Sequence, residues 1–544
     1  MAYDYIIVGG GPAGCVLAHR LSQDPSIKVL LLEAGGSDRH PYFAMPAGFA
    51  KMTKGIASWG WSTVPQRHLG GRVLRYTQAK VIGGGSSINA QIYTRGNPRD
   101  YDGWVRHEGC EGWSYRDVLP YFRRAEHNQR FDDEFHGGEG PLGVSVPVNP
   151  LPISEAFLRA AQQFGMAYNP DFNGARQAGV GHYQVTVRNA RRSSASVAYL
   201  RPIQGRRNLA VETGQFVTRI LVESGRAVGV ERLIDGALVE IRCDREVLVT
   251  SGGIGSPRLL MLSGIGPADH LRAVGISPVH DLPGVGGNLQ DHLDLYVIAE
   301  CTGAHTYDAM LKPHRAAMAG LQYLLTRQGP VASTLFETGG FWSAGDDPDW
   351  PDIQFHLGLG SGIEAGVDKL RNAGVTLNSA YLRPRSRGTV RLASADPAAA
   401  PLIDPNYWAE PHDRTMSLRG LAAAREIMSQ PALKPFILAE RMPGPDVAEE
   451  AALIDYVRRT CKTDHHPCGT CKMGTDDHAV VSPDLRVRGL EGLRVCDSSA
   501  MPRITSSNTN APTIMLGEKA ADIILGRVPL AARNSRDTAA DAHA

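Results

Sequence analysis

Two apolar runs near the N-terminus, separated by a helical pattern, predict the first elements of an α/β domain. Residues 5–8 read Tyr-Ile-Ile-Val and run into a glycine-rich turn, after which the pattern is helical through Leu21. A second apolar run, residues 28–32, ends at Glu33. Short apolar runs bounded by glycine are typical of strands, and their alternation with a helical stretch predicts a Rossmann-like arrangement.

Later runs extend this pattern and divide the chain. Residues 245–249 predict a strand that enters a double-glycine turn and a helix at 256–262, which could equally be an ordinary βα unit. Strand-like stretches such as 388–392 occur in a region without dinucleotide signals. We therefore expect a discontinuous first domain, a second domain, and a polar tail typical of disorder. The predicted bounds are 1–300 completed by 456–528, then 301–455, and 529–544 for the tail.

The turn after the first strand has the spacing of a dinucleotide-binding loop. Gly9, Gly11 and Gly14 allow a tight turn, close approach of a pyrophosphate and helix–strand packing, respectively. The pyrophosphate would then lie at the positive end of a helix. Glu33, 19 residues after Gly14, suits ribose hydroxyls and would repel a 2′-phosphate. NAD and FAD both fit, NADP is disfavoured, and a glycine-rich turn without a ligand is the alternative.

A second glycine cluster favours FAD. Three glycines at 83–85 precede Ser86, Ser87 and Asn89. Such a loop brings backbone and donors close to phosphates and flat rings. Spacing alone does not exclude a surface loop or a simple anion nest.

Composition excludes several other classes of function. The 544-residue chain has 57 Lys+Arg and 56 Asp+Glu, and its net charge of +1 gives no electrostatic footprint for nucleic acid. No apolar run reaches the roughly 20 residues of a membrane span. The first strand begins almost at once, so no signal peptide is expected. Eight scattered cysteines do not indicate a disulfide framework, and a reduced, cytoplasmic setting is the default.

The segment 465–474, His-His-Pro-Cys-Gly-Thr-Cys-Lys-Met-Gly, concentrates reactive side chains. One interpretation is a metal site, because Zn²⁺ accepts both imidazole and thiolate ligands. However, zinc-binding C-x-x-C units usually have a second pair, which this chain lacks. The preferred interpretation is that a single histidine is a general base, the cysteines pack behind it, and no metal is bound.

Together, four ordered signatures resemble the glucose–methanol–choline (GMC) oxidoreductases. They are the loop at 79–93, the segment 256–267, the segment 465–474 and the segment 508–513. The likeness is nearest to the bacterial choline dehydrogenase-like and alcohol dehydrogenase branch. It implies an FAD-binding Rossmann-like domain joined to an antiparallel-sheet substrate domain, and oxidation of alcohols.

The resemblance assigns a set of residues to FAD. Gly9, Gly11, Gly14 and Glu33 would hold the ADP half, and Asp497 would lie near the ribityl and phosphate atoms. Some relatives attach flavin through a histidine in the 79–93 loop, where this chain has Ile88, so we expect non-covalent FAD. The remaining expected contacts are Pro12, Ala13, Ala34, Val81, Gly83, Gly84, Ser86, Asn89, Ala90, Gln91, Ile92, Val217 and Thr509.

The resemblance also implies the chemistry. His466 would face flavin N5 and take the hydroxyl proton while hydride leaves the carbinol carbon of a primary alcohol, which becomes an aldehyde. Histidine suits proton transfer at neutral pH. Asn508 would hydrogen-bond the same oxygen and stabilise the developing alkoxide. We expect His465 to pack as a wall residue, and Glu337 could be structural or could bind a cationic substrate.

Partners and location follow from the same resemblance. The expected partners are a small alcohol and an electron acceptor, which could be O₂, a quinone or a redox protein, and a homodimer is left open. The expected location is the cytoplasm, or the periphery of the inner membrane if the acceptor is a quinone. The alternatives are a flavin-containing lyase resembling the hydroxynitrile lyases, and a non-catalytic binding module.

Overall fold

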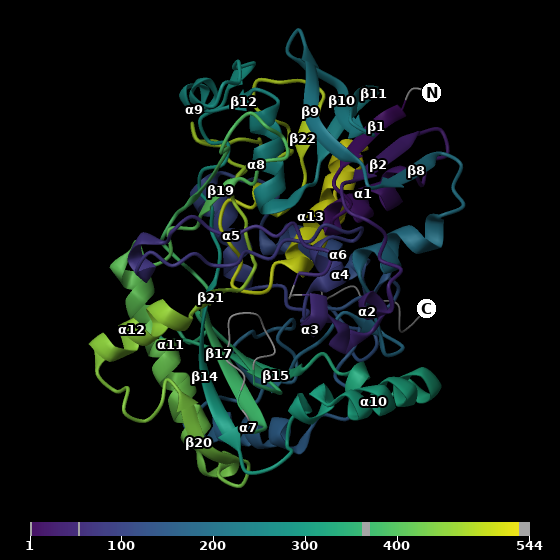
Figure 1. The fold of residues 1–544 in the computed structure, drawn as a ribbon. Coiled ribbons are helices and arrows are strands. Elements are labelled where there is room, and N and C mark those ends of the chain that lie inside the picture. The colour runs from purple at the N-terminus through teal and green to yellow at the C-terminus, as the bar shows by residue number, and fades with distance from the viewer. Residues whose placement is uncertain (1–2, 53–54, 362–369, 371, 532–544) are drawn as a thin grey trace.

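Two seven-stranded sheets organise the protein (Figure 1). The computed structural model describes residues 3–52, 55–361, 370 and 372–531. The first sheet occupies the upper half of Figure 1 and the second sheet the lower half. This mixed α/β architecture confirms the predicted fold class.

The centre of the first sheet is parallel. β1 (Tyr3–Val8) pairs with β2 (Val29–Glu33) on one side and with the end of β11 (Ala237–Val249) on the other. β8 (Leu209–Thr213) extends the sheet beyond β2, and β22 (Leu493–Val495) pairs with β11. The paired parts of β1, β2 and β11 are almost wholly buried, as expected of apolar parallel strands covered on both faces. The predicted N-terminal strands are thereby confirmed.

An antiparallel hairpin extends the first sheet at the top of Figure 1. β9 (Phe216–Glu223) and β10 (Arg226–Ile234) pair in turn with the first half of β11. The single long strand β11 therefore belongs to the antiparallel part at its start and to the parallel part at its end. This brings β9 into contact with β2.

Close helix packing supports the glycine-rich turn. α1 (Pro12–Leu21) begins at a proline, which suits the first helical position, and packs against α13 (Asn510–Ile524). A Cβ at Gly14 would collide with the carbonyl oxygen of Gly9, so only glycine lets the helix start this close to the strand. α13 also packs against α6 (Tyr115–Ala125). The C-terminal helix thus packs against elements from the N-terminal part of the chain.

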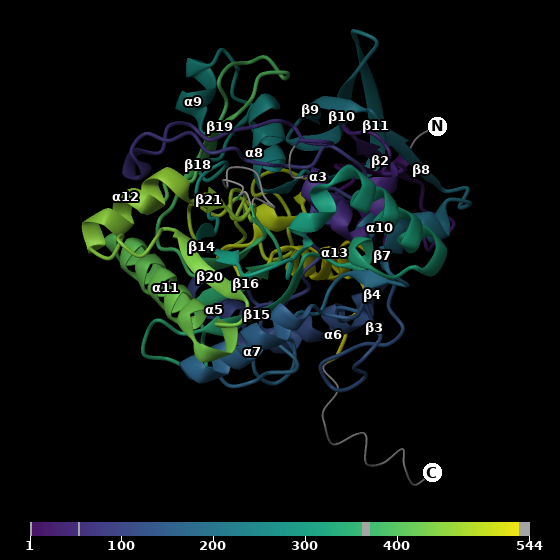
Figure 2. The same ribbon diagram turned by 60° about the horizontal axis from the view of Figure 1, so that its bottom comes forward.

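The second sheet is antiparallel throughout its main path. α7 and α11 cover its outer face in Figure 2, and apolar side chains between sheet and helices form a separate core. The strands, in spatial order, are β20 (Ile437–Met442), β14 (Leu293–Cys301), β17 (Gly374–Tyr381), β16 (Ile353–Gly358), β15 (Phe336–Trp342) and β5 (Gly179–His182), with β21 (Lys462–Thr463) beside β14. The helices are α7 (Pro152–Phe164) and α11 (Pro411–Ser429).

The second sheet is wider than the predicted range 301–455. β5, β21 and nearly all of β14 come from outside that range, because long-range pairing rather than local sequence recruits them. The predicted strand at 388–392 is β18 (Thr389–Arg391), but it pairs with β19 (Leu402–Asp404) instead of joining this sheet. Val390 is buried beside Ile254 of the first domain, which explains the separate placement. Of the predicted tail, residues 532–544 lie outside the described residues.

The remaining elements are short or peripheral. No helix among the described residues is long and apolar enough to cross a bilayer. The helices are α2 (Pro41–Ala44), α3 (Phe49–Met52), α4 (Gly85–Ile88), α5 (Pro98–Glu108), α8 (Gly252–Leu262), α9 (Ala268–Ala273), α10 (Pro313–Thr326) and α12 (Glu450–Thr460). The strands are β3 (Glu126–Asn128), β4 (Leu142–Val144), β6 (Val187–Arg188), β7 (Arg191–Arg192), β12 (Ile265–Gly266) and β13 (His280–Asp281).

Candidate active site

A cavity of about 320 Å³ lies between the two sheets and holds most of the predicted site residues. One end is walled by the carboxyl ends of the parallel strands, and the other by polar side chains of the second sheet. The predicted residues that line it are Gly9, Gly11, Pro12, Ala13, Glu33, Ala34, Gly84, Asn89, Ala90, Gln91, Ile92, Val217, His466, Asp497, Asn508 and Thr509.

Four predicted contacts, Gly14, Val81, Gly83 and Ser86, do not line the cavity. Each supports the wall instead. Gly83 has a φ of +86° and donates to the Gly10 carbonyl at 2.7 Å, and a side chain there would collide with Ser87. The Ser86 hydroxyl donates to Gly83 O at 2.6 Å. These positions fix the loop so that its neighbours reach the cavity.

The cavity is built to receive an anion such as a pyrophosphate. The N-termini of α1, α8 and α13 all open onto it, and in none does the N-cap side chain bond the first turn, although Asp497 accepts from Gly252 N at the start of α8. The first backbone N–H groups of a helix have no intrahelical partner and, with the helix dipole, favour a negative group. At Gly11 an added Cβ would meet only Thr250 O, at 3.6 Å, so backbone can approach a ligand closely there.

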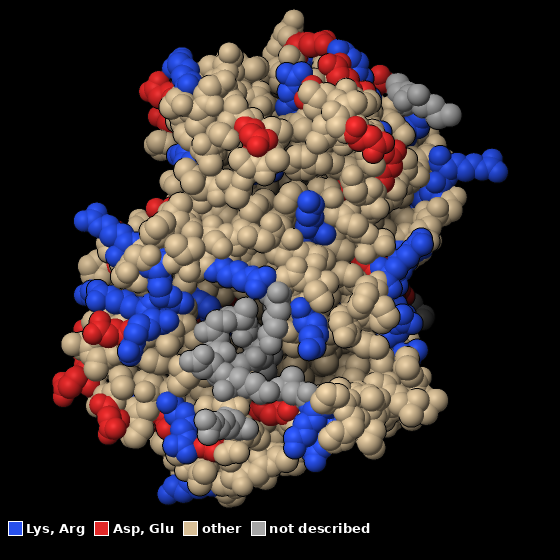
Figure 3. Space-filling model, in the orientation of Figure 1, with Lys and Arg blue, Asp and Glu red and all other residues tan. Residues whose placement is uncertain are grey.

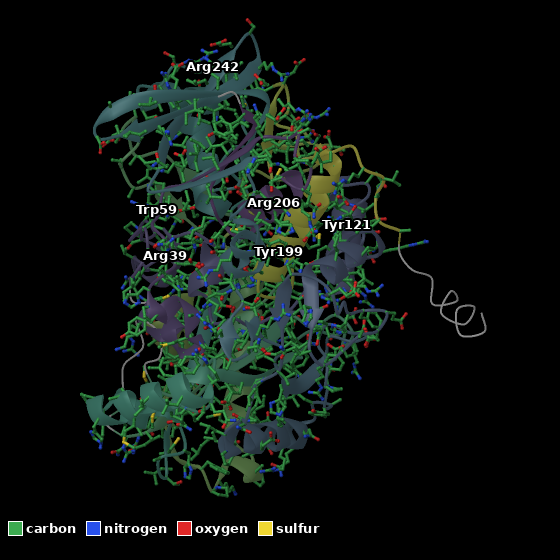
Figure 4. All side chains as sticks on the ribbon, turned by 90° about the vertical axis from the view of Figure 1, so that its right-hand side faces the viewer. Arg39, Trp59, Tyr121, Tyr199, Arg206 and Arg242 are labelled. Atoms are coloured by element: carbon green, nitrogen blue, oxygen red, sulfur yellow. The ribbon has the colours of Figure 1, made fainter. Side chains whose placement is uncertain are left out.

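Glu33 stands at the end of β2, where the sequence predicts a ribose-binding carboxylate. Its two oxygens accept from Gly10 N and Gly35 N, each at 2.7 Å. Burial raises the pKa of Glu33 to about 7. Each carboxylate oxygen keeps further acceptor capacity for a hydroxyl. The cavity beyond it is walled by Phe216 and by Trp59, which stacks on Trp61 at 5.0 Å between ring centroids and is labelled in Figure 4.

Asp497 anchors a turn that the sequence left ambiguous. Its carboxylate accepts from Gly252 N at 2.8 Å, from the Ser256 hydroxyl at 2.6 Å and from Ser499 N at 2.8 Å. Burial raises the pKa of Asp497. Gly252 and Gly253 line the cavity, so the double-glycine turn after β11 is part of the binding wall as well as a βα connection.

His466 and Asn508, 42 positions apart in sequence, meet at the other end of the cavity. His466 Nε2 lies 3.3 Å from Asn508 Nδ2. Asn508 Oδ1 accepts from the Thr94 hydroxyl at 3.1 Å and from Gln354 Nε2 at 3.0 Å. Because both donors face the same atom, the Asn508 amide is oriented with its NH₂ group toward His466 and the cavity. It can therefore donate to a substrate oxygen.

A second histidine sets the tautomer of His466. His292 Nε2 lies 3.0 Å from Leu382 O and must carry a proton, since a carbonyl only accepts. Burial lowers the pKa of His292 to about 4, so at neutral pH its Nδ1 is an acceptor. His466 Nδ1 lies 3.0 Å from that atom and therefore donates to it. The remaining nitrogen of His466, Nε2, is left unprotonated beside Asn508.

The neutral form of His466 is strongly favoured. Burial is the largest cause of a pKa well below the usual 6.5, and the neighbouring His292, His356 and His465 act in the same direction. Asp464 Oδ2 lies 3.4 Å from His466 Nδ1 and lines the cavity. A carboxylate at this distance stabilises the imidazolium that forms when Nε2 accepts a proton.

A buried carboxylate holds the backbone of both histidines. Asp291 accepts from His466 N at 2.7 Å and from His292 N at 3.0 Å. Burial raises the pKa of Asp291, and its hydrogen-bond donors oppose that shift. Three hydroxyl groups complete its shell. They belong to Tyr76, Tyr407 and Thr463.

The two cysteines of the C-x-x-C segment belong to the hydrophobic core. Cys468 and Cys471 are fully buried, and burial raises the pKa of both thiols. Their backbone N–H groups donate to Gln290 O and Ser499 O, which fixes the turn after the histidine. Within the described residues, ligand-type atoms gather instead at His292, Asp464 and His466, a group that the hydrogen bonds above account for.

The structure places His465 and Glu337, whose roles the sequence left open, in different surroundings. His465 has a φ of +61° and lines the cavity, with its ring edge-on to Tyr76 at 6.3 Å. Glu337 is 1% exposed and does not line the cavity. Four hydrogen bonds from the protein satisfy its carboxylate, so Glu337 ties segments of the second domain together. The donors are Leu151 N, the Ser154 and Ser333 hydroxyls and the Tyr307 hydroxyl.

Sequence reasoning missed the contribution of the second sheet. His356 on β16 and Asn378 on β17 line the cavity, and Gln354 orients Asn508. All three are polar side chains on strands whose residues are all buried. The sequence did carry a signal for these residues, because polar side chains occur at alternate positions of otherwise apolar strands. A buried polar side chain needs a hydrogen-bond partner, which indicates a polar site beside the strand. His292 carried no comparable signal, because it follows a loop without a recognisable motif.

Comparison with known proteins gives the relationships of the chain. The N- and C-terminal models described as GMC oxidoreductase match residues 3–294 and 384–517. The chain is 41% identical over 535 residues to an "Alcohol dehydrogenase [acceptor]" of Pseudomonas putida, covering 97% of each chain. It is 44% identical over 535 residues to an "Oxygen-dependent choline dehydrogenase" of Paraburkholderia xenovorans, covering 97% of this chain and 95% of that one.

Solved structures show the same fold. Pyridoxine 4-oxidase from Mesorbium loti superposes with a TM-score of 0.88 at 30% identity, over 97% of this chain and 100% of that chain. A formate oxidase of Aspergillus oryzae, studied for its FAD modification, has a TM-score of 0.91 at 26% identity, over 96% and 98% of the two chains.

Proposed function

Because the chain belongs to the GMC oxidoreductases, FAD-dependent enzymes that act on CH–OH donors, we propose that it oxidises a primary alcohol to an aldehyde. His466 is the proposed general base and Asn508 its partner at the substrate oxygen. The observation that carries this assignment is the hydrogen-bond chain that leaves His466 Nε2 unprotonated beside the Asn508 amide.

The proton transfer follows from these positions. A hydroxyl oxygen on the cavity side, within hydrogen-bond reach of both Nε2 of His466 and Nδ2 of Asn508, donates its proton to the first and accepts a hydrogen bond from the second. Asn508 cannot accept that proton, because its amide nitrogen is a donor. The alkoxide charge that develops on the oxygen is therefore stabilised as the proton leaves. The carboxylate of Asp464 in turn favours the protonated base.

The residues around the other end of the cavity suit FAD. The helix N-termini at the cavity would hold the pyrophosphate, Glu33 the adenosine ribose, and the wall around Phe216 and Val217 the adenine ring. Bound FAD supplies the acceptor for the hydride that leaves the carbinol carbon. We propose non-covalent binding, because the 79–93 loop contains no histidine and places the apolar Ile88 in a buried cluster.

We propose a primary alcohol as the substrate. The names of the relatives above include an alcohol dehydrogenase and a choline dehydrogenase, and a choline-type cation would need an anionic partner. Glu337 does not offer one, since its carboxylate is satisfied away from the cavity. Asp464 is the carboxylate that lines the substrate end. The candidate electron acceptors, to be compared for their rate of reoxidising the reduced flavin, are O₂, a quinone and a redox protein.

The test is anaerobic reduction of the purified yellow protein by a series of primary alcohols, followed in a stopped-flow spectrometer at the flavin absorbance. The wild-type flavin should bleach, and the His466→Ala variant should retain FAD but lose about 10²–10⁴-fold in rate. Arg242, an exposed residue of the distant hairpin labelled in Figure 4, provides a matched control as Arg242→Ala, which should bleach at the wild-type rate. Full activity in His466→Ala would contradict the base assignment, and turnover without any acceptor would favour a lyase.

A further inference from the structure

An apolar stripe on helix α10 is exposed to solvent. Met318, Leu321, Leu324 and Leu325 are 70, 58, 60 and 76% exposed. A helix turns 100° per residue, so these four positions occupy one side. The buried residues of the helix, Ala319 and Tyr323, lie on the opposite side.

The buried side ties α10 to the body of the protein. The Tyr323 hydroxyl donates to Ala190 O at 2.8 Å. The short 3₁₀ segment η6 (Pro330–Ala332) packs against α10 and against η1 (Pro46–Gly48). Phe49, directly after η1, lines the active-site cavity. The exposed stripe therefore projects from a fixed helix that stands beside the substrate end of the cavity.

The charged residues around this stripe are all basic. Residues 309–336 contain no Asp or Glu, whereas Lys312, Arg315 and Arg327 are all exposed. By helical angle, Arg315 lies beside the stripe, whereas Arg327 follows the last helical residue and its guanidinium lies over the Tyr323 ring, 5.1 Å from its centroid. The surface over α10 in Figure 3 is tan and shows no red, and Figure 4 shows the helix at the lower edge of the molecule with its side chains directed outward. Within the described part of the chain, none of these three cations forms an ion pair with a carboxylate.

From this arrangement we propose that α10 docks the enzyme on an anionic lipid bilayer. An apolar stripe flanked by cations is the pattern of a helix that lies in the membrane interface, with leucines among the acyl chains and basic side chains reaching the headgroups. No helix of the described residues spans a bilayer, and docking of this kind requires none.

A second copy of this chain fits the surface less well. A two-fold contact through α10 would bring the Arg315 and Arg327 ends of facing helices together, and like charges would oppose each other. A stable protein interface also buries about 800 Å² on each partner, more than four side chains of one helix supply. An anionic bilayer satisfies both the charges and the leucines.

The experiment is flotation of the FAD-loaded enzyme with vesicles of phosphatidylcholine, alone or mixed with phosphatidylglycerol. The wild type should float with the mixed vesicles and much less with phosphatidylcholine. The variant Leu321→Gln/Leu324→Gln/Leu325→Gln should lose binding, by about tenfold for each leucine. Arg315→Ala and Arg327→Ala should each weaken binding about fivefold, and added salt should act in the same direction.

The matched control uses Leu233→Gln/Leu238→Gln, which changes two exposed leucines of the β10–β11 hairpin. This control and the α10 variants should keep the rate of flavin reduction by an alcohol. Undiminished vesicle binding by the triple variant, or absence of binding by the wild type, would overturn the proposal. So would a wild-type dimer in analytical ultracentrifugation that the triple variant converts to monomer, because a second copy would then be the occupant.

Discussion

His292 offers a test of the base assignment that leaves His466 itself in place. The variant His292→Phe keeps a planar ring of similar size but removes the Nδ1 acceptor that lies 3.0 Å from His466 Nδ1. Without that acceptor, His466 is free to place its proton on Nε2, where it cannot accept another. The variant His292→Gln retains one donor and one acceptor, and thus can serve both Leu382 O and His466.

The magnitude follows from the lost interaction. A hydrogen bond between neutral groups is worth about 0.5–1.5 kcal/mol net, and each 1.36 kcal/mol changes a rate about tenfold. His292→Phe should therefore reduce flavin about two- to thirteenfold more slowly than the wild type, well short of the His466→Ala loss. His292→Gln should recover most of the rate.

The assay is anaerobic stopped-flow reduction over a range of alcohol concentrations and pH. The limiting rate should fall while the apparent dissociation constant of the alcohol stays the same, since the alcohol does not touch His292. The wild-type pKa of His466 is well below 6.5, so the rate should be flat through neutral pH and fall only as more acidic solutions protonate the base. An unchanged rate in His292→Phe, or a His292→Gln variant as slow as His292→Phe, would refute the tautomer argument.

Four further substitutions separate the roles within the site. Asn508→Ala should lower the limiting rate about 10²–10³-fold, because it removes the donor to the developing alkoxide, and a pre-steady-state rate near wild type would contradict that role. Asp464→Asn should slow reduction about tenfold or more by removing the carboxylate near the protonated base, with a loss in substrate affinity alone indicating a binding role instead. Cys468→Ser and Cys471→Ser should each retain alcohol-dependent bleaching far better than His466→Ala, and a metal analysis showing zinc lost with either thiol would contradict their assignment to the core.

That the residues proposed for the cofactor lie together could be predicted because their sequence signals are local. Each of these signals stands at the end of a strand predicted from the sequence. They are the Gly9–Gly14 turn, Glu33 and Asp497. Parallel strands then bring their carboxyl ends to one edge of the sheet, so residues far apart in sequence meet without any further information. The double-glycine turn at Gly252 had the same local form, and only its position beside Asp497 showed that it lines the cavity.

The second domain could not be bounded in the same way. β5 and β14 join its sheet from sequence positions before 301, while β18 lies inside the predicted range and pairs elsewhere. The pairing of antiparallel strands depends on which apolar faces pack together in three dimensions. A local pattern identifies a strand but does not specify its partner. The predicted division at 301 rested on the absence of dinucleotide signals beyond it, and it does not coincide with an edge of the sheet.

The difference between local signals and long-range contacts also explains why the sequence indicated His466 but not the residues that set its tautomer and orient its partner. Its place before Pro467 marks it in the sequence, but its proton is set by His292 from a distant loop, and its partner Asn508 is oriented by Gln354 from β16. These contacts cross between the two sheets. A base with a lowered pKa must also release each proton it accepts, and the imidazoles that surround His466 favour that release. In the proposed mechanism the second sheet thus contributes to the chemistry as well as to the shape of the cavity, and variants on β16 should alter rate as well as substrate preference.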